Sequence, residues 1–182
     1  VTEPYIEAMI ESATEMGIRF HAGRGSMTRG RASGGVVPDQ ACQTVDEVLR
    51  HSLELIEKYH DPSPSSQIRV DLAPCGVHTD EPELFREFAE IAAENPSVGL
   101  HTHLYEVVDT KYCEEIYGIT PWRFLGKNGW HDSRVWLAHM VDPPEGEIPE
   151  FAETKVGIVH IVAADLRMGF GLAPLRKYLD AG

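Results

Sequence analysis

Short apolar runs rich in β-branched residues alternate with amphipathic segments along the whole of this 182-residue chain. Five runs have the length of a strand, and they span residues 18–23, 68–73, 98–104, 135–138 and 156–162. Parallel strands joined by crossover helices produce such an order, because the helices then bury both faces of the sheet. The chain is therefore predicted to have an α/β fold. An open doubly wound sheet and a (β/α)₈ barrel both fit the alternation.

The amphipathic segments carry the sequence signals of helices. Thr44 and Glu47 form a capping box in front of apolar residues at helical spacing, which predicts a helix over residues 44–59. Similar apolar stripes over residues 84–92 and 6–13 predict two more helices. Each of these helices would connect or flank the predicted strands.

Two irregular stretches, residues 25–41 and 141–149, interrupt this order. The first is long for a connection that follows a strand, and six glycines and serines lie between residues 25 and 39. Long loops in compact domains usually have a function. We therefore expect residues 25–39 to cover a site at the C-terminal end of the preceding strand and to become ordered around a substrate.

Composition and charge exclude several classes of partner. The formal net charge of −13 disfavours a nucleic-acid polymer, because phosphate binding needs clustered Lys and Arg. No stretch of about 18 apolar residues is present, so no membrane span is expected and we predict a cytoplasmic protein. The three cysteines are widely spaced and predict free thiols rather than a disulfide framework. Assembly into a homo-oligomer is compatible with this composition.

The segment Gly99-Leu-His-Thr-His-Leu-Tyr-Glu106 contains the clearest signal of chemistry. Residues two apart on a strand point to the same side, so His101 and His103 share a face, and Glu106 lies just beyond the strand end. An imidazole that holds a metal ion beside a carboxylate that carries protons suits metal-assisted hydrolysis. The alternative is that both histidines only pack and hydrogen-bond within the sheet.

Histidines occur at or near the ends of three further runs, at His21, His139 and His160. Taken singly, each is more often a structural histidine than a ligand. Barrel enzymes, however, assemble their sites from the C-terminal ends of several strands. We therefore predict that His21, His103 and His139 lie near one rim of the fold.

Several segments together resemble one known family. They are Phe20-His-Ala-Gly-Arg-Gly-Ser-Met27 with Gly34-Gly-x-x-Pro-Asp39, Leu72-Ala-Pro-Cys75, Leu100-His-Thr-His-Leu-Tyr-Glu106, Trp136-Leu-Ala-His139 and Leu166-Arg-Met-Gly-Phe-Gly-Leu-Ala-Pro174. In this order they resemble the amidohydrolase superfamily, in the branch that contains 8-oxoguanine deaminase, S-adenosylhomocysteine deaminase and the triazine hydrolases. The resemblance covers essentially the whole chain and implies a (β/α)₈ TIM-type barrel.

The resemblance also implies roles for individual residues. His103 matches the metal-binding histidine of the fifth barrel strand, and Glu106 matches the acid/base three residues later. His139 matches the sixth-strand histidine that contacts the attacking water or the leaving group, whereas His101 matches a position that is not usually a ligand. The implied cofactor is one divalent metal ion, zinc or alternatively iron. If a neutral imidazole at His103 binds the metal, the affinity for the metal should decrease as the pH drops below about 6.5, the ordinary pKa of histidine.

Substrate contacts are expected from two residues in these segments. Arg24 and Cys75 lie where the chain looks most like the 8-oxoguanine deaminase subgroup, and we expect both to bind the substrate. Trp122 and Trp130 are candidates for the same planar pocket, although aromatic side chains more often belong to the core.

The resemblance places residues 1–182 in the central part of a barrel domain, with about five of its eight strands. The first-strand His-x-His pair of the family would precede Val1, and its eighth-strand aspartate would follow Gly182. One segment departs from the subgroup, which has His-Cys-Pro-Ser-Ser-Asn where this chain has His160-Ile-Val-Ala-Ala-Asp165. Substrate contacts in that segment are therefore in doubt.

Three functions remain open from the sequence. The first is a metal-dependent deaminase that releases ammonia from a small heterocycle, with an 8-oxoguanine-like purine or a pterin favoured. The second keeps the metal and removes chloride or hydrolyses an amide. The third is a metal-free relative that binds without catalysis. The flanking sequence of the chain would distinguish the third from the first two.

Overall fold

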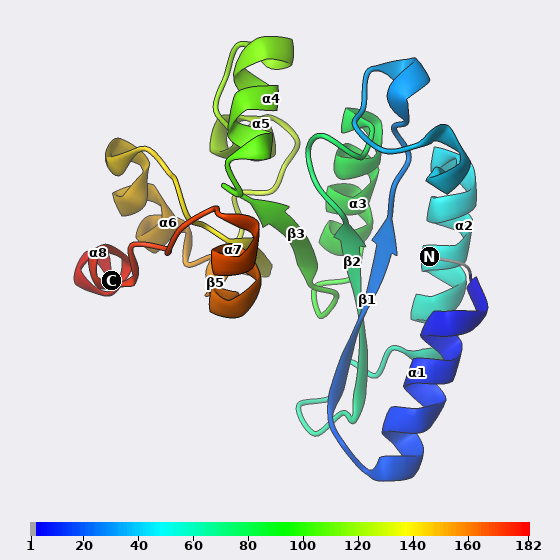
Figure 1. The fold of residues 1–182 in the computed structure, drawn as a ribbon. Coiled ribbons are helices and arrows are strands. Elements are labelled where there is room, and N and C mark those ends of the chain that lie inside the picture. The colour runs from blue at the N-terminus through cyan, green and yellow to red at the C-terminus, as the bar shows by residue number, and fades with distance from the viewer. Residues whose placement is uncertain (1–2) are drawn as a thin grey trace.

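The computed structural model describes residues 3–182 and contains one parallel sheet of five strands with helices between them (Figure 1). The strands are β1 (Phe20–Ser26), β2 (Ile68–Pro74), β3 (Leu100–Leu104), β4 (Val135–His139) and β5 (Gly157–Val159). The helices are α1 (Glu3–Met16), α2 (Val45–Tyr59), α3 (Pro82–Glu94), α4 (Val108–Tyr117), α5 (Pro121–Lys127), α6 (Ile148–Thr154), α7 (Val162–Met168) and α8 (Leu175–Ala181). Three short 3₁₀ helices span Arg31–Ser33, Asp39–Ala41 and Glu145–Glu147.

The strand order distinguishes between the two predicted architectures. Each strand pairs in parallel with the next one in sequence, in the order β1-β2-β3-β4-β5. A doubly wound sheet reverses its strand order at a switch point, whereas a (β/α) barrel adds every strand in the same direction. The observed order is that of the barrel. All five predicted strands are confirmed as adjacent and parallel.

Two strands start later than predicted, because backbone N–H groups at the predicted starts form hydrogen bonds within the preceding turns. The backbone N–H of Ile18 donates to Ala13 O and closes the end of α1, so β1 starts at Phe20. Val98 N donates to Asn95 O, and β3 starts at Leu100. The capping box of α2 is present as predicted, with Thr44 N donating to the Glu47 carboxylate at 2.8 Å and Glu47 N donating to Thr44 Oγ1.

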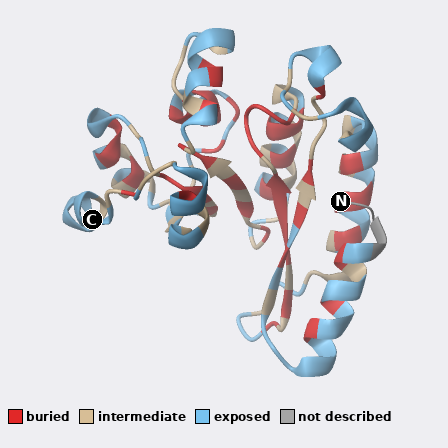
Figure 2. Cartoon of the chain, viewed as in Figure 1, coloured by how far each residue is buried: buried red, intermediate tan, exposed pale blue. Residues whose placement is uncertain are grey.

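The main core lies between the sheet and the helices that cover its outer side (Figure 2). Val135 and Leu137 of β4 are buried on this side, as are Leu100 and Leu104 of β3. The opposite side, which carries His101 and His103, is only partly buried. None of the helices formed by the described residues is long and apolar enough to cross a membrane.

Candidate active site

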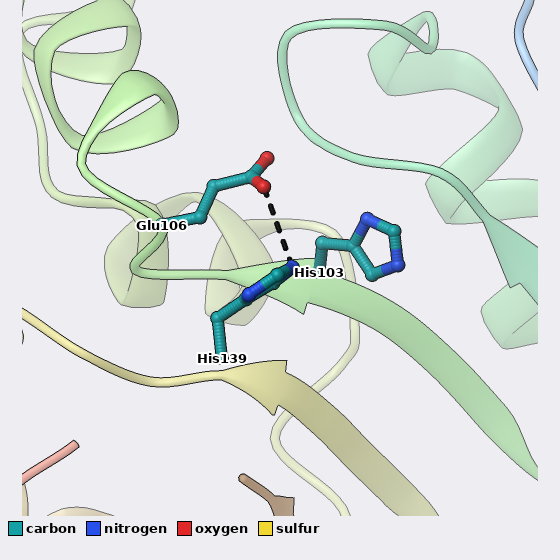
Figure 3. Close-up of side chains that lie close together, drawn as sticks. All are labelled: His103, Glu106 and His139. Atoms are coloured by element: carbon teal, nitrogen blue, oxygen red, sulfur yellow. Dashed lines mark ion pairs between the residues drawn. The ribbon is translucent and has the colours of Figure 1, made fainter. Parts of the chain in front are cut away.

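Three polar side chains converge where β3 and β4 end (Figure 3). His103 lies on β3, Glu106 lies in the turn after it, and His139 is the last residue of β4. One ligand atom from each residue lies within 4.8 Å of the others, and this is the only such group found among the described residues. The parallel sheet explains the meeting, because Leu104 of β3 is paired with His139 of β4.

The backbone after β3 aims Glu106 toward the two imidazoles. Tyr105 and Val107 have positive φ values of 54° and 72°, so the chain turns sharply on both sides of Glu106. The buried carboxylate of Asp109 accepts the N–H of Tyr105 at 2.7 Å and that of Glu106 at 2.8 Å. Asp109 therefore holds a turn that few non-glycine residues adopt.

His139 reaches the site through a second unusual backbone conformation. Regular alternation along β4 would place His139 on the helix-covered side with Val135 and Leu137. A positive φ of 72° at His139 breaks this alternation, and its ring lies 5.0 Å from the ring of His103. His139 Nε2 is 3.4 Å from Glu106 Oε2, and Nδ1 is 2.5 Å from Asp165 Oδ1.

Burial controls the electrostatics of the group. It raises the pKa of Glu106 to about 7, and the nearby carboxylates of Asp109 and Asp165 add to this effect. Burial likewise lowers the pKa of His103 to about 4, with smaller contributions from neighbouring histidines. The His103 imidazole is thus neutral well below pH 6.5. Protonation of His103 should therefore weaken metal binding only below about pH 4 in this environment, rather than from the ordinary histidine value of about 6.5.

Three contributors to the site were not predicted from the sequence. His78, in the loop after β2, brings Nε2 to 3.5 Å from Glu106 Oε1, on the carboxylate oxygen that does not face His139. Asp109 and Asp165 contact the site through Glu106 and His139. Only the position of His78 a few residues beyond a strand end could have suggested it. The contacts of the two aspartates depend on turns that no spacing predicts.

Of the two predicted substrate contacts, one lies in the site. Cys75 Sγ is 3.9 Å from His103 Nδ1, and Cys75 lines a cavity of about 270 Å³ together with His101 and His103. Arg24 is buried on the helix-covered side of β1, and its guanidinium Nη1 donates to Gly25 O and to Gln43 Oε1. The structure therefore does not bring Arg24 to the other predicted residues.

Two other expectations are corrected by position. His21 is the second residue of β1 and its Nδ1 is 2.9 Å from Asp71 Oδ2, in the N-terminal half of the sheet. The prediction that His21 shares a rim with His103 is wrong, because β1 continues for five residues beyond it. Trp122 and Trp130 are fully buried in the main core, so the core alternative holds for both.

The donors present fit a zinc ion. Imidazole nitrogen and carboxylate oxygen are ordinary zinc ligands, and catalytic zinc sites combine such donors with an open position. The partly buried, neutral imidazole of His103 and the adjacent His139 supply nitrogen donors in a partly enclosed site. His101 is held by other contacts, because its ring stacks on that of Trp136 with the ring centres 3.6 Å apart and its Nδ1 lies 2.9 Å from Trp136 O.

The whole chain, residues 1–182, matches the sequence profile of the Amidohydrolase family. The chain belongs to this family. 8-Oxoguanine deaminase from Pseudomonas aeruginosa is 34% identical to it over 99% of the chain and 40% of the relative. Hydroxydechloroatrazine ethylaminohydrolase from Pseudomonas sp. strain ADP is 31% identical over 92% of the chain and 38% of the relative.

Solved amidohydrolases share the fold. The atrazine chlorohydrolase of Arthrobacter aurescens TC1, in a structure with zinc, is 56% identical and superposes with a TM-score of 0.94 over 98% of the chain and 39% of that protein. The five parallel strands thus form part of a TIM-type barrel. The chain spans about 40% of the length of the curated relatives named here.

Proposed function

We propose that the complete protein is a metal-dependent hydrolase that displaces an exocyclic substituent from an sp² ring carbon of a nitrogen heterocycle. One observation carries the proposal, which is the buried contact of Glu106 with His139 beside His103. Membership of the Amidohydrolase family supports it. A zinc ion held by His103 would lower the pKa of an attacking water.

Glu106 is the proton carrier in this proposal. Its carboxylate accepts the proton of the attacking water and donates it to the leaving group, which requires a pKa near the working pH. Burial of the side chain raises the pKa of Glu106 to about 7, which meets this requirement. His78 and His139 each approach a different oxygen of the carboxylate and restrict its orientation.

The proton chemistry favours an amine as the leaving group. An amine must be protonated before it departs, and Glu106 is placed to do this. We therefore propose hydrolytic deamination, with an 8-oxoguanine-like purine or a pterin as the ring. Cys75 borders the cavity beside His103 and is proposed to contact that ring. Arg24 is proposed to act on the substrate indirectly. Its guanidinium donates to Gly25 O and so holds the backbone of β1 in place.

Removal of chloride from a triazine is the second candidate. Identity to the atrazine chlorohydrolase is 56%, compared with 34% to the 8-oxoguanine deaminase over a similar share of the chain. The two candidates differ in the product released. Purified complete protein should therefore be assayed for ammonia with 8-oxoguanine and isoxanthopterin, and for chloride with atrazine.

The substitution Glu106→Gln tests the mechanism in the complete protein. It retains the shape of the side chain and removes its proton chemistry, so turnover should fall by about 10² to 10⁴ while zinc content stays unchanged. Glu115→Gln, on the exposed side of α4, is the matched control and should keep full turnover. Near-normal turnover of Glu106→Gln would remove Glu106 from the mechanism.

A further inference from the structure

Residues of the segment after β5 contact the imidazole of His139. Asp165 lies in the short helix α7 and is completely buried, and His139 is only 4% exposed. Asp165 Oδ1 is 2.5 Å from His139 Nδ1, and the ring of Phe170 packs edge-on against the same imidazole at 6.0 Å. Asp165 is the last residue of the segment where the chain departs from the subgroup pattern, and it stands at the position of the subgroup's asparagine.

We propose that Asp165 is a positioning residue that fixes the tautomer and the orientation of His139, an inference that rests on the proposed function. A carboxylate only accepts hydrogen bonds, so a neutral His139 that contacts Asp165 must carry its hydrogen on Nδ1. The lone pair of Nε2 then points toward Glu106 and His103. Such a partner behind a site histidine sets which ring nitrogen is available to the chemistry.

The long contact between His139 and Glu106 agrees with this tautomer. Nε2 is 3.4 Å from Glu106 Oε2, longer than a normal hydrogen bond, although the two side chains are only 5% and 12% exposed. Two acceptors that face each other do not bond without a shared proton or a cation. With Nδ1 protonated, His139 thus presents a lone pair to the space that it shares with Glu106 and His103.

Two backbone hydrogen bonds fix the position of Asp165 in α7. Its N–H donates to Ile161 O at 3.0 Å, and its carbonyl accepts the N–H of Phe170 at 2.9 Å. The second carboxylate oxygen, Oδ2, lies 3.7 Å from Nδ1 of His160 at the end of β5. Neither of these two atoms has a hydrogen-bond partner among the described residues. Asp165 therefore lies between two histidines and makes its short contact with His139 only.

The test compares three substitutions of Asp165 in the complete protein. Asp165→Asn keeps an oxygen that accepts from Nδ1–H, whereas Asp165→Leu and Asp165→Ala remove the acceptor. Ring ¹⁵N chemical shifts of His139, measured on metal-free protein, report the tautomer without any substrate. We expect the Nδ1–H tautomer in the wild type and in Asp165→Asn, and a large Nε2–H population in the Leu and Ala variants.

Steady-state kinetics supply the second measurement. Loss of the acceptor should lower kcat by about 10-fold to 100-fold with a smaller change in KM, because groups that orient a site histidine act mainly through it. Asp165→Asn should recover most of this loss. Asp180→Asn, on the exposed surface of α8, is the control and should change neither measurement.

Two results would overturn the proposal. One is a His139 tautomer that stays Nδ1–H in both the Leu and the Ala variant. The other is an Asp165→Asn protein that loses as much kcat as these two variants while its tautomer is unchanged. The tautomer measurement needs neither metal nor substrate. It therefore remains informative if Glu106→Gln leaves turnover intact and the proposed function fails.

Discussion

At the scale of single residues, Asp80 shows how burial makes stability depend on pH. Its carboxylate is fully buried where β1 and β2 end, and it accepts from Ser26 Oγ at 2.8 Å and from the backbone N–H of Cys75 at 2.9 Å. Desolvation nevertheless raises the pKa of Asp80 from 3.8 to about 6, although these hydrogen bonds oppose the rise. The fold therefore favours the protonated form of Asp80.

The sign of the pH effect follows from this rise. Asp80 contributes stability that is fully present below pH 3.8 and is lost as the pH rises through about 6. Asp80→Asn removes this dependence, and its amide can still accept from Cys75 N and donate to Ser26 Oγ. Relative to the wild type, we expect the variant to gain on the order of 1 kcal/mol between pH 5 and pH 8. Chemical unfolding of the complete protein at both values measures the gain.

Glu114→Gln is the control for this experiment, because the Glu114 side chain is exposed on α4. Its difference from the wild type should be the same at pH 5 and pH 8. An equally flat result for Asp80→Asn would mean that Asp80 has a normal pKa in the folded protein. The hydrogen bonds to the carboxylate would then offset the cost of its burial.

The residues that could be located from the sequence are those at or just beyond the C-terminal ends of the strands. His103 and Glu106 follow from spacing near one strand end, and His139 follows from the end of the next strand. Asp109 and Asp165 could not be found in this way, because Asp109 contacts a turn with positive φ at Tyr105 and Val107, and Asp165 contacts His139, whose own φ is positive. Local strain of this kind is not visible in a hydrophobic pattern.

At the scale of elements, the connection between β1 and α2 is attached to α4. The Arg29 guanidinium lies 5.8 Å from the ring centres of both Tyr112 and Tyr117, and the Tyr112 hydroxyl donates to Gly34 O at 2.8 Å. These contacts keep residues 27–44 at the C-terminal ends of the strands, on the same rim as Glu106. The connection thus has the location expected of a cover. Its ordering around a substrate stays a prediction.

Arg29→Ala should loosen this connection without unfolding the sheet. Each cation–π contact is worth about 0.5–2 kcal/mol, so amide hydrogen exchange in residues 29–41 should become roughly 10-fold faster. We expect KM to rise more than kcat falls, because substrate retention depends on the cover. Exchange measured by mass spectrometry on the complete protein, with and without substrate, provides the test.

Arg31→Ala is the matched control for Arg29→Ala, since Arg31 lies in the same connection. Among the described residues, its side chain makes one hydrogen bond, from Nε to Val36 O at 3.4 Å. Exchange in this variant should match the wild type. If Arg29→Ala showed wild-type exchange as well, the contacts with Tyr112 and Tyr117 would not hold the connection. The cover would then have to be attached elsewhere.

The existence and order of the five strands and of helices α1, α2 and α3 were predictable, whereas helices α4 to α8 and the ends of most elements were not. Alternation of apolar runs identified all five strands and the capping box located the start of α2. The ends depend on which amide closes a turn, as at Ile18 and Val98. The same limit explains the error at His21, whose strand extends to Ser26 and so leaves His21 far from the active rim.

At the scale of the whole molecule, a metal ion at His103 would add a link between side chains that come from different elements of the barrel. His103 and His139 come from two strands, and Glu106 comes from the turn that leads into α4. A ligand that binds only the folded state stabilises it by mass action. Zinc should therefore raise the unfolding temperature of the complete protein, and its removal by a chelator should lower it.

Substitution of two neighbouring histidines tests whether His103 is the residue that binds zinc. His103→Ala should lose zinc and the associated thermal shift, whereas His101→Ala should keep both. His101 lies on the same face of β3 two residues away, but its ring is stacked on Trp136 and its Nδ1 contacts Trp136 O. Elemental analysis and thermal unfolding, with and without chelator, measure the difference. Undiminished zinc in His103→Ala would overturn the metal assignment, and equal loss in His101→Ala would show that the whole β3 end, rather than one imidazole, determines metal binding.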